Sequence, residues 1–242
     1  MKREKLAAVF FAAAIVFGLA GSAGAVDGTI EINQATVLAA GGFPYTIAAS
    51  GSYRLTGNLT LPANTNGIIV TASNVTIDLN GFTITGAGSS STGTGIESAS
   101  VISITVENGT ITGFFTGVNA GTNGIVKSVH AVRNGSGIAA GFSGMVQGCT
   151  ATGNTKGFGI AGAGNTVISG NTANANAVGI ECQSSGCLIT NNVINSNTGP
   201  AISAADGTTA YGWNVMNGDA GGISGGLSMG GGNTNACGAS PC

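Results

Sequence analysis

The chain has 242 residues and a formal net charge of −2, with 44 glycines and only 7% charged residues. An ordinary globular domain carries charge on about a quarter of its residues. A disordered chain lacks the 43% hydrophobic content found here, so the composition excludes both classes. Because the apolar residues are interleaved with Gly, Asn, Thr and Ser, we expect many short strands joined by tight turns in one continuous domain.

Residues 1–25 have the pattern of a secretory signal peptide. A basic start precedes an apolar run over residues 6–20 and a small-residue cleavage site at residues 23–25. We therefore expect a mature chain that begins near Val26 and is secreted, periplasmic or displayed at the cell surface. No later segment resembles a transmembrane helix, so we expect no membrane contact after cleavage.

Removing the signal peptide leaves four basic residues against eight carboxylates. The four are Arg54, Lys127, Arg133 and Lys156. A protein that binds nucleic acid needs a basic stripe to neutralise phosphates, and four scattered cations do not form one. The charge balance therefore excludes nucleic acid as a partner.

Residues 26–50 are predicted to cap the N-terminal end of the domain. Residues 31–40 have the pattern of a short helix, and residues 45–47 and 52–61 have the pattern of strands. A cap favours solubility, because the end of a stack of strands otherwise exposes its apolar core and unpaired strand edges.

A dipeptide with a small residue before an apolar one recurs along residues 51–232. The steps between its copies are 28, 22, 20, 22, 20, 22 and 21 residues, and such a period is the signature of a stacked solenoid. The copies are Gly67-Ile68, Gly95-Ile96, Gly117-Val118, Gly137-Ile138, Gly159-Ile160, Gly179-Ile180, Ala201-Ile202 and Gly222-Ile223. Residues 233–242 form a separate C-terminal tail that contains cysteines.

The recurring glycine is predicted to bend the chain between strands, because Gly tolerates the positive φ that other residues avoid. The Ile after it is predicted to point into the core. About 21 residues per coil leave room for three short strands and their turns. We therefore predict an all-β fold, a right-handed parallel β-helix of about eight coils with a short N-terminal helical cap.

The second half of each repeat aligns without gaps over residues 125–134, 145–154, 167–176 and 188–197. One column of equivalent residues is Val129, Cys149, Asn171, Asn192 and Asn214, and another is Ala131, Ala151, Ala173, Ile194 and Met216. The first contains a run of Asn and is predicted to form a ladder in which each amide bonds its copies above and below. The second stays small or apolar and is predicted to line the core.

All five cysteines follow the signal peptide, which fits an oxidising compartment. Cys182 and Cys187 lie in one repeat and Cys237 and Cys242 close the chain, with four residues between the members of each pair. Each pair is a candidate local disulfide, although spacing does not establish connectivity. We interpret Cys149 as a buried thiol in the Asn column. We expect no metal site, since the usual two-residue Cys spacing and a partner His are missing.

The segments GSYRLTGNLTLP (51–62), NVTIDLNGFTITG (74–86) and ITVENGTITGF (104–114) resemble the secreted bacterial right-handed parallel β-helix proteins of the pectin-lyase-like superfamily. With the later Gly-Ile repeats, the resemblance covers roughly residues 42–232. It implies the coil and says little of activity, because the catalytic motifs of the polygalacturonase-like, pectate-lyase-like, pectin-methylesterase-like and alginate-epimerase-like members are not found. No cofactor is expected, and calcium is implied only if the chain acts as a lyase.

A small group of ionisable residues is the best candidate site. Glu107 and Lys127 are predicted to occupy equivalent outward positions on neighbouring coils. His130 and Arg133 follow Lys127 on its coil, and Asp78 lies one coil earlier. In a catalytic interpretation, these side chains abstract a proton beside a uronate carboxylate, as in a lyase, with Asp78 binding the substrate.

The structural alternative is that Glu107 and Lys127 form an exposed cross-strand pair worth less than about 1 kcal/mol. His130 and Arg133 are then solvated turn residues. We favour this alternative because no two carboxylates are seen to converge at the separation that glycosidases need.

Two further features of the sequence bear on function. Phe114 and Phe115 lie at a turn between coils and are candidate substrate contacts, although a role in the core is the simpler interpretation. The pairs Thr83/Thr85, Thr110/Thr112 and Thr150/Thr152 form an outward array that resembles ice-binding solenoids and breaks at His130/Val132. Thr is also a common outward strand residue.

We therefore expect an exported β-helix protein of a surface or matrix that is not catalytic and interacts with polysaccharide or with protein. The alternative is a carbohydrate-active enzyme, either a polysaccharide lyase or a glycoside hydrolase. Ice binding is a third hypothesis. The sequence leaves the oligomeric state open.

Overall fold

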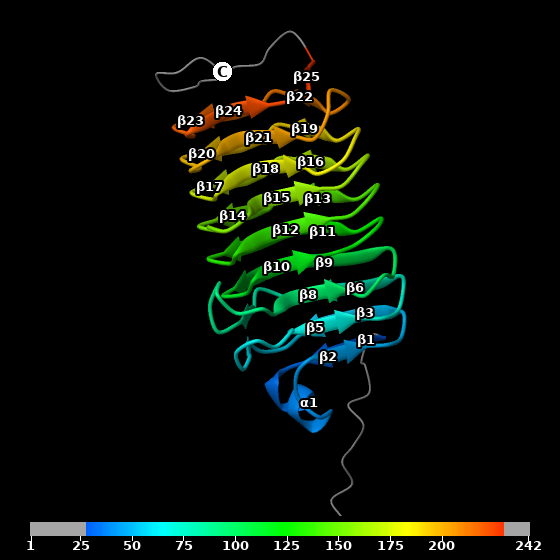
Figure 1. Ribbon diagram of the computed structural model, residues 1–242. Coiled ribbons are helices and arrows are strands. Elements are labelled where there is room, and N and C mark those ends of the chain that lie inside the picture. The colour runs from blue at the N-terminus through cyan, green and yellow to red at the C-terminus, as the bar shows by residue number, and fades with distance from the viewer. Residues whose placement is uncertain (1–27, 230–242) are drawn as a thin grey trace, which may run out of the picture.

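A computed structural model describes residues 28–229 and shows a rod of stacked coils with a short helix at its N-terminal end (Figure 1). Every strand pair is parallel and joins one coil to the next, so backbone hydrogen bonds run along the axis of the rod. The predicted all-β parallel solenoid is confirmed. In this part of the chain, no helix has the length and apolar character needed to cross a membrane.

The nine-strand sheet takes one strand from each coil. Its strands are β2 (Tyr45–Ile47), β5 (Ile68–Val70), β8 (Thr94–Ser98), β10 (Thr116–Asn119), β12 (Ser136–Ala140), β15 (Phe158–Gly162), β18 (Val178–Cys182), β21 (Pro200–Ala204) and β24 (Gly221–Ser224). The Ile or Val of every copy of the repeated dipeptide lies in this sheet, in register with its neighbours. The ninth coil comes from β2, because Tyr45 pairs with Ile68.

The sixteen-strand sheet covers the rest of the rod, and its strands bend around a corner in each coil. Before the corner lie β1 (Thr29–Ile32), β3 (Gly51–Leu55), β6 (Val75–Asp78), β13 (Met145–Gln147), β16 (Val167–Ser169), β19 (Leu188–Thr190), β22 (Ala210–Gly212) and β25 (Leu227–Ser228). After it lie β4 (Leu59–Thr60), β7 (Thr83–Thr85), β14 (Thr150–Thr152), β17 (Thr172–Asn174), β20 (Val193–Asn195) and β23 (Val215–Asn217). Two longer strands, β9 (Ile104–Thr112) and β11 (Ile125–Val132), run through the corner.

Helix α1 (Gln34–Ala39) is shorter than the helix predicted over residues 31–40. Residues 29–32 instead form β1, which pairs with β3. The helix begins at Asn33 because the Asn33 side chain accepts a hydrogen bond from the Thr36 N–H, and the Thr36 hydroxyl accepts one from the Asn33 N–H. Val37 is its buried contact with the core.

The glycine of the repeated dipeptide is needed for close packing and not for the bend that the sequence suggested. The glycines at 67, 95, 117, 137, 159 and 179 do not have a positive φ. A Cβ at Gly117 would lie 2.7 Å from the Gly137 carbonyl oxygen and 3.0 Å from Asn134 Nδ2. Neighbouring coils therefore approach too closely at this column for a side chain.

The predicted core column is confirmed. Ala131, Ala151, Ala173, Ile194 and Met216 are register partners on successive strands, and each is at most 1% exposed. The outward neighbours of these residues on each strand are more exposed, as expected from the alternation of side chains across a strand.

The predicted Asn ladder forms inside the corner. Asn171 donates from its backbone N–H and its Nδ2 to Asn192 Oδ1, at 2.9 and 3.0 Å, and Asn192 donates in the same way to Asn214. Cys149 occupies the next position, where its N–H donates to Asn171 Oδ1 at 2.8 Å. Cys149 is a free, buried thiol, as interpreted from the sequence.

A second ladder, which the sequence reasoning missed, lies beside the close-packed glycines. It consists of Asn134, Asn154, Asn176, Asn197 and Asp219. Each Asn also donates from Nδ2 to a backbone carbonyl of the preceding coil, as Asn176 does to the Ala151 oxygen at 3.0 Å. These residues close the aligned repeats, so their recurrence at the C-terminal end of each segment was the available signal.

Candidate functional site

A column of charged side chains crosses the first coils of the sixteen-strand sheet. Glu31, Arg54, Asp78, Glu107 and Lys127 are register partners on successive strands. The predicted equivalence of Glu107 and Lys127 is therefore correct. Asp78 and Glu107 are register partners on neighbouring coils, so two acidic residues that were not seen to converge in the sequence occupy equivalent positions.

Both of these carboxylates already have partners. Lys127 Nζ lies 2.7 Å from Glu107 Oε2, with the two side chains 47% and 18% exposed. Asp78 Oδ1 accepts hydrogen bonds from the Asn80 N–H at 2.8 Å and from Asn108 Nδ2 at 3.2 Å. Glu107 is therefore engaged in the ion pair with Lys127, and Asp78 fixes the turn that leads into the corner. An exposed pair of this kind contributes less than about 1 kcal/mol.

The corner separates Lys127 from His130. Ser128 sits at the corner with a φ of 53°, so the strand β11 changes direction between these two residues. His130 then pairs in register with Thr110 and with Thr150. Arg133 is exposed at the next bend, with a φ of 54°. The candidate cluster is therefore divided between two faces and does not form one wall.

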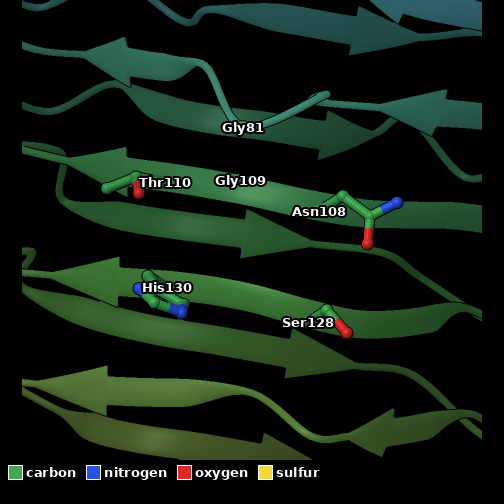
Figure 2. A pocket seen from close by; sticks show the side chains of 6 residues that line it. All are labelled: Gly81, Asn108, Gly109, Thr110, Ser128 and His130. Atoms are coloured by element: carbon green, nitrogen blue, oxygen red, sulfur yellow. The ribbon is translucent and has the colours of Figure 1, made fainter.

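A hollow of about 340 Å³ lies at this corner and is open to solvent. Its lining residues are Gly81, Asn108, Gly109, Thr110, Ser128 and His130. Figure 2 shows Asn108 beside Ser128, and Thr110 beside His130, on the neighbouring strands β9 and β11. The lining offers an amide, two hydroxyls and an imidazole, and these groups donate and accept hydrogen bonds.

Gly109 contributes only backbone to the hollow. It is the register partner of the buried Val129, and a Cβ there would point into the core, against Leu79 and 2.7 Å from the Phe82 carbonyl oxygen. Glycine is therefore required here for the packing of the corner. Of these lining residues, His130 was a catalytic candidate from the sequence and Thr110 belonged to the predicted Thr array. The others were missed because the fold of the corner, and not a motif, brings them together.

The structure separates the two phenylalanines. Phe114 is fully buried, and its ring packs where Gly86 and Gly95 leave room for it. Its N–H donates to Asn134 Oδ1 at 3.0 Å. A substrate contact by Phe114 is thus wrong, since no ligand reaches it. Phe115 is 50% exposed and remains a candidate contact at the turn before β10.

The Thr array lies beyond the corner, in the arrangement that the sequence indicated. Thr83/Thr85 pair with Thr110/Thr112, and these pair with His130/Val132 on the next strand. Thr150/Thr152 follow. The imidazole and the Val side chain therefore interrupt the array in its centre.

One predicted disulfide is present, between Cys182 and Cys187 at the end of β18. Its Cys182 sulfur accepts a hydrogen bond from the Thr209 hydroxyl at 3.2 Å. Cys237 and Cys242 lie outside the described residues. Across residues 28–229, no group of three or more His, Cys, Asp or Glu side chains is placed to hold a metal ion.

The parallel coils, the inward aliphatic columns and the Asn ladders define the class of the protein as a β-solenoid. A family model described as a right-handed β-helix region matches residues 66–217, which is more than half of the chain. The chain therefore belongs to the right-handed β-helix family, in agreement with its resemblance to pectin-lyase-like proteins. No curated protein and no solved structure matches the chain.

Proposed function

We propose that the protein is an exported, non-catalytic β-helix that binds polysaccharide at the hollow of the corner. The observation that carries this proposal is the chemistry of the lining, in which Asn108, Thr110, Ser128 and His130 present hydrogen-bonding groups. Sugar hydroxyls are both donors and acceptors, so they match such a lining. The volume lies within the range of ligand sites, which begins at about 300 Å³.

The placement of the charged groups supports binding over catalysis. Glu107 and Lys127 are paired with each other, and Asp78 accepts two hydrogen bonds from the turn. A general acid or base must reach the proton that it transfers, and the corner turns Lys127 away from His130. In this proposal, Asp78, Glu107 and Lys127 therefore stabilise the surface beside the hollow.

The proposed location is outside the cytoplasm. The signal-peptide pattern of residues 1–25 supports export, and the disulfide between Cys182 and Cys187 supports an oxidising compartment. Polysaccharides of a cell surface or matrix are accessible from there. Detection of the mature chain outside the cytoplasm, with an N-terminus near Val26, tests this part of the proposal.

A glycan array with the mature protein, followed by titration calorimetry of each positive glycan, tests the binding proposal. We expect Thr110→Ala and His130→Ala each to weaken binding between about 2-fold and 10-fold, the loss of one hydrogen bond. Thr46→Ala is the matched control, because Thr46 is exposed on β2 in the other sheet. Binding that is equal in all three variants would place the ligand elsewhere.

An assay of turnover distinguishes the enzyme alternative. Release of unsaturated, ultraviolet-absorbing products from a uronate panel, abolished by Lys127→Ala or His130→Ala, would establish a lyase that uses Glu107, Lys127 and His130. The ice-binding hypothesis predicts thermal hysteresis that is lost in Thr110→Tyr. We expect neither, because the charged groups are paired and His130 interrupts the Thr array.

A further inference from the structure

The corner that contains the hollow continues toward the C-terminal end of the rod. The equivalent corner residues of successive coils all have a positive φ, between 53° and 67°. They are Asn108, Ser128, Gly148, Gly170, Asn191 and Trp213. Each precedes an inward residue of the column that becomes the first Asn ladder, so the rigid interior of the rod fixes the line of the corner.

The middle of the corner is open. A Cβ at Gly148 or at Gly170 would meet nothing within 4 Å. Beyond the hollow, the corner therefore runs over bare backbone for two coils before it reaches Asn191 and Trp213. At these two coils the corner itself carries no side chain, and apart from the neighbours along the chain none lies within 4 Å of where a Cβ would be.

The two columns that flank this part of the corner are uncharged. On one side lie Gln147, Ser169, Thr190 and Gly212. On the other side lie Thr150, Thr172, Val193 and Val215. The second column changes from hydroxyl to apolar groups along the rod, and Val193 and Val215 are each 40% exposed. A charged ligand would lose hydration here and gain no ion pair in return.

Trp213 ends the corner, and its side chain is 51% exposed. Trp213 follows Asn191 along the corner, and Val193 and Val215, two residues further along each strand, are register partners. An aromatic ring of this kind packs against the C–H face of a pyranose ring, while hydroxyls at the edge of the sugar reach neighbouring polar groups. Four coil steps, roughly 19 Å at the strand spacing, separate Ser128 from Trp213.

We propose that a neutral, extended polysaccharide lies along this corner, from the hollow at His130 over Gly148 and Gly170 to a stacking contact on Trp213. This inference rests on the proposed polysaccharide binding and adds the charge class, the direction and the far contact of the ligand. The uncharged flanks select a neutral chain over a uronate chain. The length of the corner selects an oligosaccharide over a single sugar.

The fluorescence of Trp213 reports on this contact directly, because the chain has only one tryptophan. Neutral hexasaccharides of glucose, mannose and xylose are titrated against the mature protein and compared with the disaccharides and with a hexauronate. We expect a saturable change in emission with a neutral hexasaccharide, and binding at least about tenfold tighter than that of its disaccharide. Tighter binding of the hexauronate would overturn the charge class.

Trp213→Gly tests the stacking contact with a residue that is native at the equivalent positions 148 and 170. We expect calorimetric affinity for the hexasaccharide to fall about tenfold and affinity for the disaccharide in the hollow to stay unchanged. Trp213→Phe, which keeps an aromatic face, is expected to retain most of the affinity. The thermal midpoint of each variant shows whether it is folded.

The outcomes separate this inference from the proposed function. If glycans bind by calorimetry but neither Trp213 emission nor the Trp213→Gly affinity changes, the path along the corner is wrong and binding at the hollow stands. If no glycan binds by calorimetry at any length, the proposed function and this inference both fail.

Discussion

The coils up to Phe114, called here the aliphatic half of the rod, and the coils after it, called the amide half, are held together by different interactions at equivalent positions. In the column beside the close-packed glycines, Phe114 fills the interior of one coil, and Asn134, Asn154 and Asn176 fill the coils that follow. The same backbone geometry thus accommodates either an aromatic ring or a row of hydrogen-bonded amides in its interior. The ladder is stable in the interior because each buried amide finds partners on both neighbouring coils.

The outer surfaces of the two halves also differ, because charged side chains are replaced by uncharged ones along the rod. The first coils carry the charged column that ends at Lys127, and the later coils continue that column with Gln147, Ser169 and Thr190. Side chains on the surface of a solenoid can change without altering the core. Variants in the core columns of the two halves therefore test what stabilises the rod, and variants on the surface test what binds a ligand.

The largest effect is expected from Phe114→Ala in the aliphatic half. Removing a fully buried ring leaves a cavity between the coils of Gly86 and Gly95, and the free energy of unfolding is expected to fall by about 4 kcal/mol. Urea denaturation measures the loss. Phe115→Ala is the matched control, because this neighbour is half exposed and its loss is expected to be below about 1 kcal/mol. Equal losses would contradict the assigned core role.

Asn176→Ala removes one amide from the second ladder, in the amide half of the rod. It leaves the Asn154 N–H and Nδ2 and the Ala151 oxygen buried without their partner, and a loss of about 3 kcal/mol in the free energy of unfolding is expected. Asn174→Ala, which removes an outward Asn two residues earlier at the end of β17, is expected to change stability by less than about 0.5 kcal/mol. A similar change in both variants would mean that the ladder adds little.

Cys149 makes the amide half sensitive to high pH. Burial raises the pKa of its thiol from 9.0 to about 11. The folded state thus keeps a proton that the unfolded chain releases, so this contribution to stability is complete below pH 9 and is lost as pH rises toward 11. The loss amounts to about 3 kcal/mol at the upper limit. Stability measured against pH is expected to fall less steeply in Cys149→Ala, and parallel curves would refute this role.

Asp219→Asn is expected to extend the second ladder by one complete unit. Asp219 Oδ1 accepts from Asn197, but Asp219 Oδ2 is buried without a hydrogen-bond partner among the described residues. An amide nitrogen there has the Ile194 carbonyl in the place that the Ala173 carbonyl has for Asn197. We expect a gain of about 1 kcal/mol in urea denaturation. Asp206→Asn, in an exposed turn, is the control and is expected to give no gain.

Lys127→Ala has the smallest expected effect. The exposed pair with Glu107 contributes less than about 1 kcal/mol, and the loss is expected to shrink further in high salt. Glycan affinity at the hollow is expected to be unchanged, since Lys127 does not line it. A large loss of glycan affinity in this variant would move the binding site to the charged column.

Much of this architecture was predictable from local repetition. The equivalence of Glu107 with Lys127, the inward column from Ala131 to Met216 and the Asn171 ladder all followed from aligning coils. A parallel stack brings equivalent residues together at each step, so a correct alignment of the coils predicts which residues lie next to each other. The second ladder was not predicted, although its asparagines recur at the C-terminal end of each aligned segment.

The sequence by itself determined the coil, its period and the inward column from Ala131 to Met216, because these depend on a pattern that each coil repeats. Only the tertiary structure decided that the repeated glycines serve close contact, that Phe114 is buried, and that Lys127 and His130 lie on opposite sides of a corner. Those features depend on distances between coils and on the angle of the corner. Neither quantity is encoded in the residues of a single repeat.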